Sequence, residues 1–169
     1  MAVTASVTQS VAGSQNTALD LGTATFPFAA SASVAYSSGT GAGQVDLVFT
    51  DTRTLAASGT ENLDLAGSLT GAFGATLTFA RIKAIHFSAA AANTNNVQVT
   101  YPASNGVPFF MAAGDGIALR PGAAFTWSSG TADATGVLVT AGTGDLITVT
   151  NSAGTTSVTY NVVIVGCSA

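Results

Sequence analysis

Hydrophobic and polar residues alternate along much of this chain, which is the pattern of half-buried β-strands. The clearest example spans residues 44–50, where Val45, Leu47 and Phe49 occupy every second position. The longest strand candidate is Thr76–Phe87, and both of its faces are partly apolar. A strand with two apolar faces is typical of a position between two packed layers. The pattern therefore predicts β-strands that belong to a layered fold.

The second half of the chain contains a series of short strand candidates separated by turn residues. These candidates are Asn96–Tyr101, Val107–Met111, Gly116–Leu119, Ala123–Trp127, Gly136–Ala141, Asp145–Thr150 and Thr156–Val165. Pro121-Gly122 fits the central positions of a type II turn, and Asn151–Gly154 predicts the loop of a β-hairpin. Strands that recur about every 8–12 residues are typical of sandwiches and jelly rolls. We therefore predict an all-β protein, an antiparallel, jelly-roll-like β-sandwich of about eight or more short strands.

The beginning of the chain is less strongly patterned and predicts a separate segment. Apolar residues alternate with Thr and Ser over Val3–Val7, which indicates either one strand or an extended arm, and Gly13–Thr17 predicts a turn. Pro27 restricts any strand around it to the edge of a sheet. We expect residues 1–38 to form an arm that packs on the domain or on a neighbour, and residues 39–169 to form the sandwich.

Composition narrows the possible functions. The chain has 169 residues and carries only four Lys or Arg and eight Asp or Glu, so 7% of it is charged and its net charge is −4. Such a chain has no basic footprint for nucleic acid. No apolar run is long enough for a membrane helix, although the mean hydropathy is +0.48. Cys167 is the only cysteine, which excludes an internal disulfide and a cysteine-based zinc cluster.

The surface of this protein is expected to be unusually neutral. Ala, Gly, Ser and Thr make up just over half of the chain. Charge normally keeps soluble proteins apart, so a neutral surface suits a protein whose exterior meets other subunits. A merely atypical surface is the alternative. The first 14 residues lack a basic region followed by an apolar core, so we expect synthesis and folding in a cytoplasm without a secretory signal.

Candidate catalytic chemistry is sparse. His86 is the only histidine, and no Gly-x-Ser-x-Gly sequence supplies a nucleophile elbow, so a packed or interface histidine is favoured over a catalytic triad. The acidic residues are dispersed and form no D-x-D-x-D-G calcium loop, although loop acids could still converge on a calcium site in the fold. We expect no enzyme activity, no cofactor and no metal.

Two further groups of residues have competing interpretations. Arg81 and Lys83 are two positions apart in a strand, so they are expected to project together from one face. They are either solvated charges or a contact to an acidic residue of another subunit. The aromatic residues between Phe109 and Trp127 are expected in the core or a subunit interface rather than on a carbohydrate platform.

Several segments resemble structural proteins encoded among the virion genes of tailed bacteriophages. These segments are Asp51–Ala57, Leu63–Gly67, Phe73–Phe79, Lys83-Ala84, Leu119–Gly122, Thr140–Leu146, Val149–Asn151 and Tyr160–Gly166. The resemblance covers roughly residues 39 to 166 and consists of turns and strand ends rather than a catalytic signature. It implies a non-enzymatic virion component with a jelly-roll-like fold, such as a capsid decoration (cement) protein.

The resemblance and the composition together give the functional expectation. We expect a decoration protein that is made in the host cytoplasm and binds the outer capsid surface. Its expected partners are the major capsid protein and copies of itself, with which it forms a homotrimer. Nucleic acid, membranes and small-molecule substrates are not expected. The candidate contact residues are Val3, Val7, Arg53, Arg81, Lys83 and His86.

Three alternatives stay open at this point. The protein could be a tail, baseplate or head-fibre component. It could instead be a receptor- or glycan-binding module in which Trp127 or Tyr101 stacks on a sugar. A hydrolase would require His86 to lie close to an acid and a nucleophile.

Overall fold

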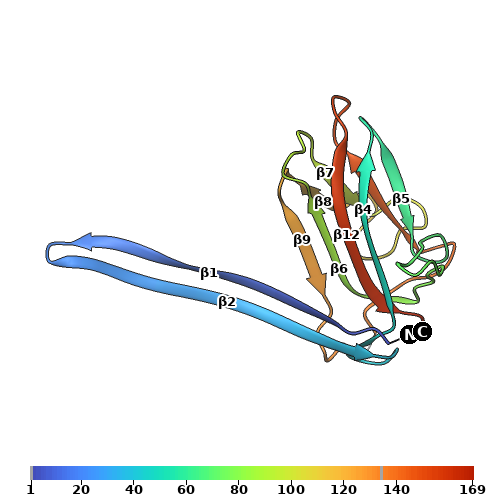
Figure 1. Cartoon of the computed structure of the whole chain (residues 1–169), viewed down its shortest axis with the longest axis horizontal. Helices are drawn as coiled ribbons and strands as arrows, with labels where there is room; N and C mark the ends of the chain where they lie inside the picture. Colours follow the sequence, from blue (N-terminus) through green and yellow to red (C-terminus); the bar gives the residue numbers. More distant parts are fainter. Residues whose placement is uncertain (1, 134) are drawn as a thin grey trace.

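The computed structural model describes residues 2–133 and 135–169, and every regular element in that part of the chain is a β-strand. Figure 1 shows a β-sandwich from which one long hairpin projects. The strands are β1 (Ala5–Leu19), β2 (Gly22–Ser38), β3 (Gln44–Val45), β4 (Leu47–Leu55), β5 (Thr60–Asp64), β6 (Arg81–Ala89), β7 (Val97–Thr100), β8 (Gly116–Leu119), β9 (Ala124–Ser128), β10 (Val137–Leu138), β11 (Leu146–Asn151) and β12 (Val158–Cys167). The all-β prediction is confirmed.

Two antiparallel sheets form the body of the molecule. One has the strand order β10-β6-β12-β4, with β9 also paired to β6, and the other has the order β5-β11-β7-β8. Side chains from both sheets meet in one core, where the rings of Phe87 and Tyr160 lie 6.0 Å apart. Leu63 of β5 and Val97 of β7 face them from the other sheet and are fully buried. The prediction of an antiparallel sandwich is therefore confirmed.

A β-bulge in β6 changes which residues face the core. Val165 of β12 pairs with Ala84, but the next residue of β12, Gly166, pairs with Ile82, so Lys83 is an extra residue in β6. Because of this insertion, Ile82 packs in the main core while Ala84 packs on the opposite side of the sheet. Simple alternation would have placed both residues on one face, and the bulge breaks that alternation.

The structure confirms some of the predicted turns and short strands and contradicts others. The Pro121-Gly122 turn is confirmed, because Gly122 has a φ of 78° and the amide of Ala123 donates to the carbonyl of Arg120 at 2.8 Å. Asn151–Gly154 does not close a hairpin, since β11 and β12 belong to different sheets. The strand expected over Val107–Met111 is absent, and those residues form turns and bends.

Residues 5–38 form a hairpin with a continuous ladder. β1 and β2 pair from Ala5 opposite Tyr36 to Leu19 opposite Gly22, and Asp20-Leu21 makes the turn. The turn predicted over Gly13–Thr17 is therefore wrong, and those residues lie inside β1. Pro27 lies in a part of β2 that pairs only with β1, which agrees with the predicted edge position.

Candidate interaction surface on the hairpin

The root of the hairpin packs on the outer face of the β6-β12-β4 sheet. Val34 and Tyr36 of β2 are buried there against Ala84 and Val165. The Tyr36 hydroxyl lies 2.6 Å from the carbonyl oxygen of Ser129 and 2.9 Å from that of Lys83. Burial raises the pKa of Tyr36 above its ordinary value. These contacts anchor the hairpin on the sandwich.

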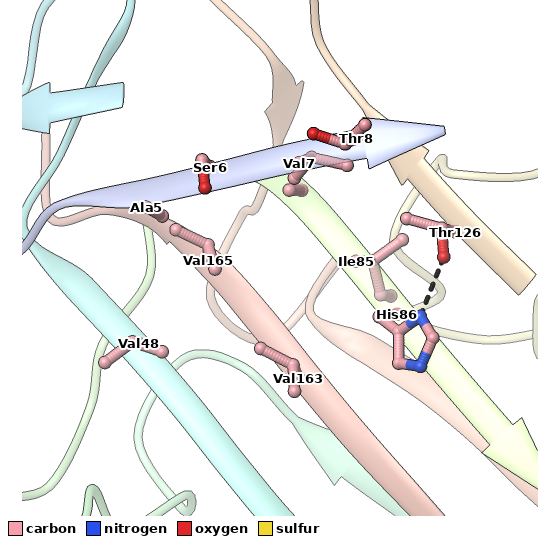
Figure 2. A pocket seen from close by; sticks show the side chains of 11 residues that line it. Ala5, Ser6, Val7, Thr8, Val48, Ile85, His86, Thr126, Val163 and Val165 are labelled. Carbon is pink, nitrogen blue, oxygen red and sulfur yellow. Dashed lines mark hydrogen bonds between the residues drawn. The ribbon is translucent and has the colours of Figure 1, made fainter. Parts of the chain in front are cut away.

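A groove of about 460 Å³ lies between the root of β1 and the same sheet. Figure 2 shows Val7 above Val163 and Val165, with His86 beside the groove. The Nδ1 atom of His86 lies 2.7 Å from the Thr126 hydroxyl oxygen. The side-chain amide of Gln9 donates to the Thr126 carbonyl at 2.9 Å, so β1 is tied to β9 where it leaves the sandwich.

Val3 lies over a neighbouring pocket at the same end of the molecule. This pocket has a volume of about 340 Å³ and is lined by Val3, Leu47, Phe73 and Leu77 among others. Val3, Ala5 and Val7 are all half-buried, while the Thr and Ser residues between them are exposed. The alternation seen in the sequence thus corresponds to one side of β1 resting on the sandwich.

Beyond the root, the hairpin has two chemically different faces. Cross-strand partners share a face, so the register assigns every residue of both strands to one side or the other. The apolar face of the projecting part consists of Val11, Leu19, Ala24, Phe26, Phe28, Ala30 and Ala32, with Gln9, Gln15 and Thr17 beside them. The hydroxyl face consists of Ser10, Ala12, Ser14, Asn16, Ala18, Thr23, Thr25, Pro27, Ala29 and Ser31.

No other element of the described chain packs on the apolar face of the projecting part. Both Val11 and Phe26 are 67% exposed, and Phe28 is partly covered only because its ring lies across Gly13 on the opposite strand. Of the eight large hydrophobic residues that are exposed in the described part of the chain, five lie on this hairpin. An exposed, contiguous apolar surface usually marks an interaction site.

Charge is almost absent from the same element. Asp20, at the turn, is the only charged side chain before Asp46. The other seven acidic residues and all four basic residues belong to the sandwich. A partner that binds the hairpin must therefore recognise shape and apolar area rather than charge.

Arg53 belongs to an ion-pair network in the sandwich. Its guanidinium lies 2.9 Å from Asp51 and donates through Nε to Glu61 at 2.7 Å. The hydroxyl of the buried Tyr160 donates to the same Glu61 carboxylate at 2.8 Å. The hydrogen bond to Glu61 raises the pKa of Arg53, and burial together with Glu61 raises the pKa of Tyr160. The network joins β4, β5 and β12.

Arg81 and Lys83 differ in exposure, so they are not the pair of solvated charges that was one of the two expectations. Lys83 is the extra residue of the β6 bulge and has no exposed surface, whereas Arg81 is partly exposed and donates to the carbonyl of Thr135 at 3.3 Å. A buried side chain cannot be the surface contact that was expected of Lys83.

The aromatic residues of the second half pack against the core. The ring of Phe109 meets Trp127 edge-on at 5.0 Å and Phe110 edge-on at 5.3 Å. Together with Phe125, these side chains are half-buried against the main core. This agrees with the expected core role of the group. The ring of Trp127 is in contact with the ring of Phe109.

Three of the six predicted contact residues come together in the fold. Val3, Val7 and His86 all lie at the root of the hairpin, whereas Arg53 and Arg81 do not line its pockets. Sequence reasoning missed the exposed residues Phe26 and Phe28. The signal that could have found them is that apolar residues alternate on both sides of Asp20-Leu21, as in two strands joined by a tight turn.

Comparison with known proteins identifies no relative: no protein-family model, curated protein or solved structure matches this chain. Among the described residues, no three His, Cys, Asp or Glu side chains lie close enough together to hold a metal ion. The described part of the chain also contains no helix long and apolar enough to cross a bilayer.

Proposed function

We propose that this protein is a structural component of a tailed-phage particle, a decoration protein that binds the outer surface of the capsid and stabilises the shell. The observation that carries the proposal is the hairpin. The sandwich has a complete core of its own, yet the chain adds a long ribbon with a single charged side chain, and only the root of this ribbon is buried. An element of this kind serves contact with other proteins rather than the stability of its own domain.

The mechanism is the burial of surface. Each apolar square ångström that is covered on the shell contributes about 25 cal/mol, so a subunit that bridges several capsid proteins raises the cost of separating them. Many identical copies multiply a modest contact through avidity. This mechanism uses no catalytic residue and no cofactor.

The test uses particles of the phage that encodes this chain, prepared with its gene deleted. Purified protein added back should sediment with these particles and should raise the temperature at which the shells lose their DNA. A variant with a shortened hairpin, in which Asn-Gly replaces residues 11–30, is compared with the full-length protein in both measurements. Ser10 and Ser31 are cross-strand partners, so Asn-Gly can join them in a type I′ turn without changing the register of the root.

Two outcomes would contradict the decoration proposal. Failure of the full-length protein to bind the particles would remove it. Immunolabelling of wild-type particles at the tail or at head fibres, rather than over the capsid surface, would replace it with the corresponding tail, baseplate or fibre role.

A further inference from the structure

We propose that the open edge of β4 pairs with the same edge of a second copy of this chain, antiparallel and centred on Thr52. β4 ends its sheet in the order β10-β6-β12-β4, and among the described residues only β12 pairs with it. An edge strand with unpaired backbone groups can add another strand. The pairing involves only this chain, so it does not depend on the proposed attachment to a capsid.

The hydrogen bonds of Thr159 show which backbone groups of β4 lie along the open edge. Thr159 of β12 is the cross-strand partner of Thr54. Its carbonyl accepts from the amide of Ala90 at 3.0 Å, and its amide donates to the Asn93 side chain at 2.9 Å, so both groups point away from β4. Thr54 therefore directs its own amide and carbonyl outward, and the alternation of the ladder gives Thr52 the same direction.

The amide of Thr52 agrees with this orientation and shows how the free chain protects the edge. It donates to Oδ1 of Asp51 at 2.9 Å rather than to a neighbouring strand. The other oxygen of that carboxylate accepts from Nη1 of Arg53, also at 2.9 Å. Charged side chains on an edge strand discourage pairing with unrelated strands. A strand that pairs here must therefore carry charges that complement Asp51 and Arg53.

The order of residues in β4 makes a second copy such a partner. Residues 50–54 read Thr-Asp-Thr-Arg-Thr, so opposite charges flank Thr52 symmetrically. In an antiparallel pair centred on Thr52, Asp51 of each copy lies opposite Arg53 of the other. The outer threonines of the segment likewise lie opposite each other. Cross-strand pairs of opposite charge and of threonine both stabilise a sheet, and an unrelated strand would have to reproduce this order of charges.

The contacts that protect the edge in the free chain can be exchanged for equivalent contacts between copies. Arg53 donates to Glu61 through Nε at 2.7 Å and to Asp51 through Nη1, so Nη1 can move to the second copy's Asp51 while Nε stays on Glu61. The amide of Thr52 then donates to the Thr52 carbonyl of the second copy. Each contact that is given up is replaced, so no donor or charge is left without a partner.

The test is disulfide crosslinking of the full chain, because the proposed register predicts which positions meet. Thr52 lies on the two-fold axis, so the Cα atoms of two Thr52→Cys chains should be about 5.5 Å apart, within the range of a disulfide. For Thr50→Cys the two Cα atoms would be at least about 13 Å apart, because four residues of strand separate them. On non-reducing gels, Thr52→Cys should form dimers at least about tenfold faster than Thr50→Cys.

Two further samples check the register and the background. A mixture of Thr50→Cys and Thr54→Cys should crosslink faster than either variant alone, because these positions face each other across the pair. The unsubstituted chain should form no disulfide-linked dimer, because its Cys167 is fully buried. Thermal unfolding verifies that each variant is folded, since the three threonines are exposed in the free chain.

A change of charge tests the ion pairs between copies. Asp51→Lys in the Thr52→Cys background brings like charges together at both symmetry-related pairs, so crosslinking should slow by about tenfold or more. Asp20→Lys in the same background is the matched control. It makes the same change of net charge at the tip of the hairpin (Figure 1) and should not slow crosslinking.

Three results would overturn the inference. The first is the absence of dimers from Thr52→Cys, and the second is equal crosslinking of Thr52→Cys and Thr50→Cys, because contact would then be random. The third is equal slowing by the two charge variants, because the pairing would then not depend on the charges of β4. Capsid binding by a chain that does not crosslink would leave the decoration proposal standing, and crosslinking without capsid binding would leave the edge pairing standing.

Discussion

The hairpin and the sandwich are built from the same kinds of residue but differ in what covers them. Both are antiparallel strands rich in Ala, Ser, Thr and Val, and both alternate apolar and polar positions. In the sandwich, a second sheet closes over the apolar side, so Phe87 is completely buried. In the hairpin no second layer exists beyond the root, so Phe26 stays exposed. Alternation specifies a strand and its apolar side, and only a second layer makes that side a core.

The largest expected difference between the two regions is tested by one substitution made in each. Phe87→Ala should lower the free energy of unfolding by about 3–5 kcal/mol, because it leaves a cavity between the sheets. Phe26→Ala should change it by less than about 0.5 kcal/mol, since the side chain makes little contact within its own chain. Urea unfolding of both variants, at a concentration where the protein is monomeric, measures the difference. Equal losses would mean that the hairpin is covered within the chain.

A smaller effect is expected from adding one methyl group to a glycine in each region. A Cβ on Gly166 would lie 2.1 Å from the carbonyl oxygen of Arg81, beside the β6 bulge, and nothing lies within 4 Å of a Cβ on Gly22. Gly166→Ala should therefore cost about 1–3 kcal/mol, because backbone has to move. Gly22→Ala should be neutral or stabilise by up to about 1 kcal/mol. Thermal unfolding compares the two, and a harmless Gly166→Ala would contradict the close approach of β6 and β12.

The smallest expected effect is a dependence of stability on alkaline pH. The pKa of Tyr160 is raised in the folded state by burial and by its hydrogen bond to Glu61, and burial also raises the pKa of Tyr36. In the unfolded chain both titrate near about pH 10. Above that pH the folded state binds more protons than the unfolded state, so stability is lost as the pH rises. The stabilisation is fully present below about pH 10 and falls, by at most about 1.4 kcal/mol per pH unit for each group, until the pH passes the pKa of that group in the folded state.

Two variants assign this pH dependence to the two regions. Tyr160→Phe should remove the contribution of the sandwich, and Tyr36→Phe should remove that of the hairpin root. Urea unfolding at a series of pH values above about pH 9 measures the slopes. An unchanged slope in Tyr160→Phe would show that the Tyr160 hydroxyl does not keep its proton in the folded state.

The sequence allowed most of the sandwich to be predicted, because its strands are local patterns. The expected Gly116–Leu119 strand is β8, and Asp145–Thr150 differs from β11 by one residue at each end. The strand predicted over Val107–Met111 failed for a physical reason. Phe109 and Phe110 are apolar because they pack against the core from a loop, and burial alone does not require a ladder.

The features of the candidate interaction surface depend on contacts between distant residues, which a local pattern does not contain. The β6 bulge depends on the pairing of Ile82 and Ala84 with β12, nearly half the chain away. The groove beside His86 forms only because β1 crosses the outer face of the β6-β12-β4 sheet. The long hairpin was missed because Gly13–Thr17 has turn-forming residues, and the cross-strand register keeps them extended.

The two ends of the described chain share one small region at the foot of the hairpin. Val3 and Asp46 line the same pocket, and the backbone amide and hydroxyl of Ser168 both donate to the Asp46 carboxylate. In Figure 1 the N and C labels accordingly lie side by side. A label attached beside Val3 or Ser168 would therefore lie at the root and leave the far tip of the ribbon clear.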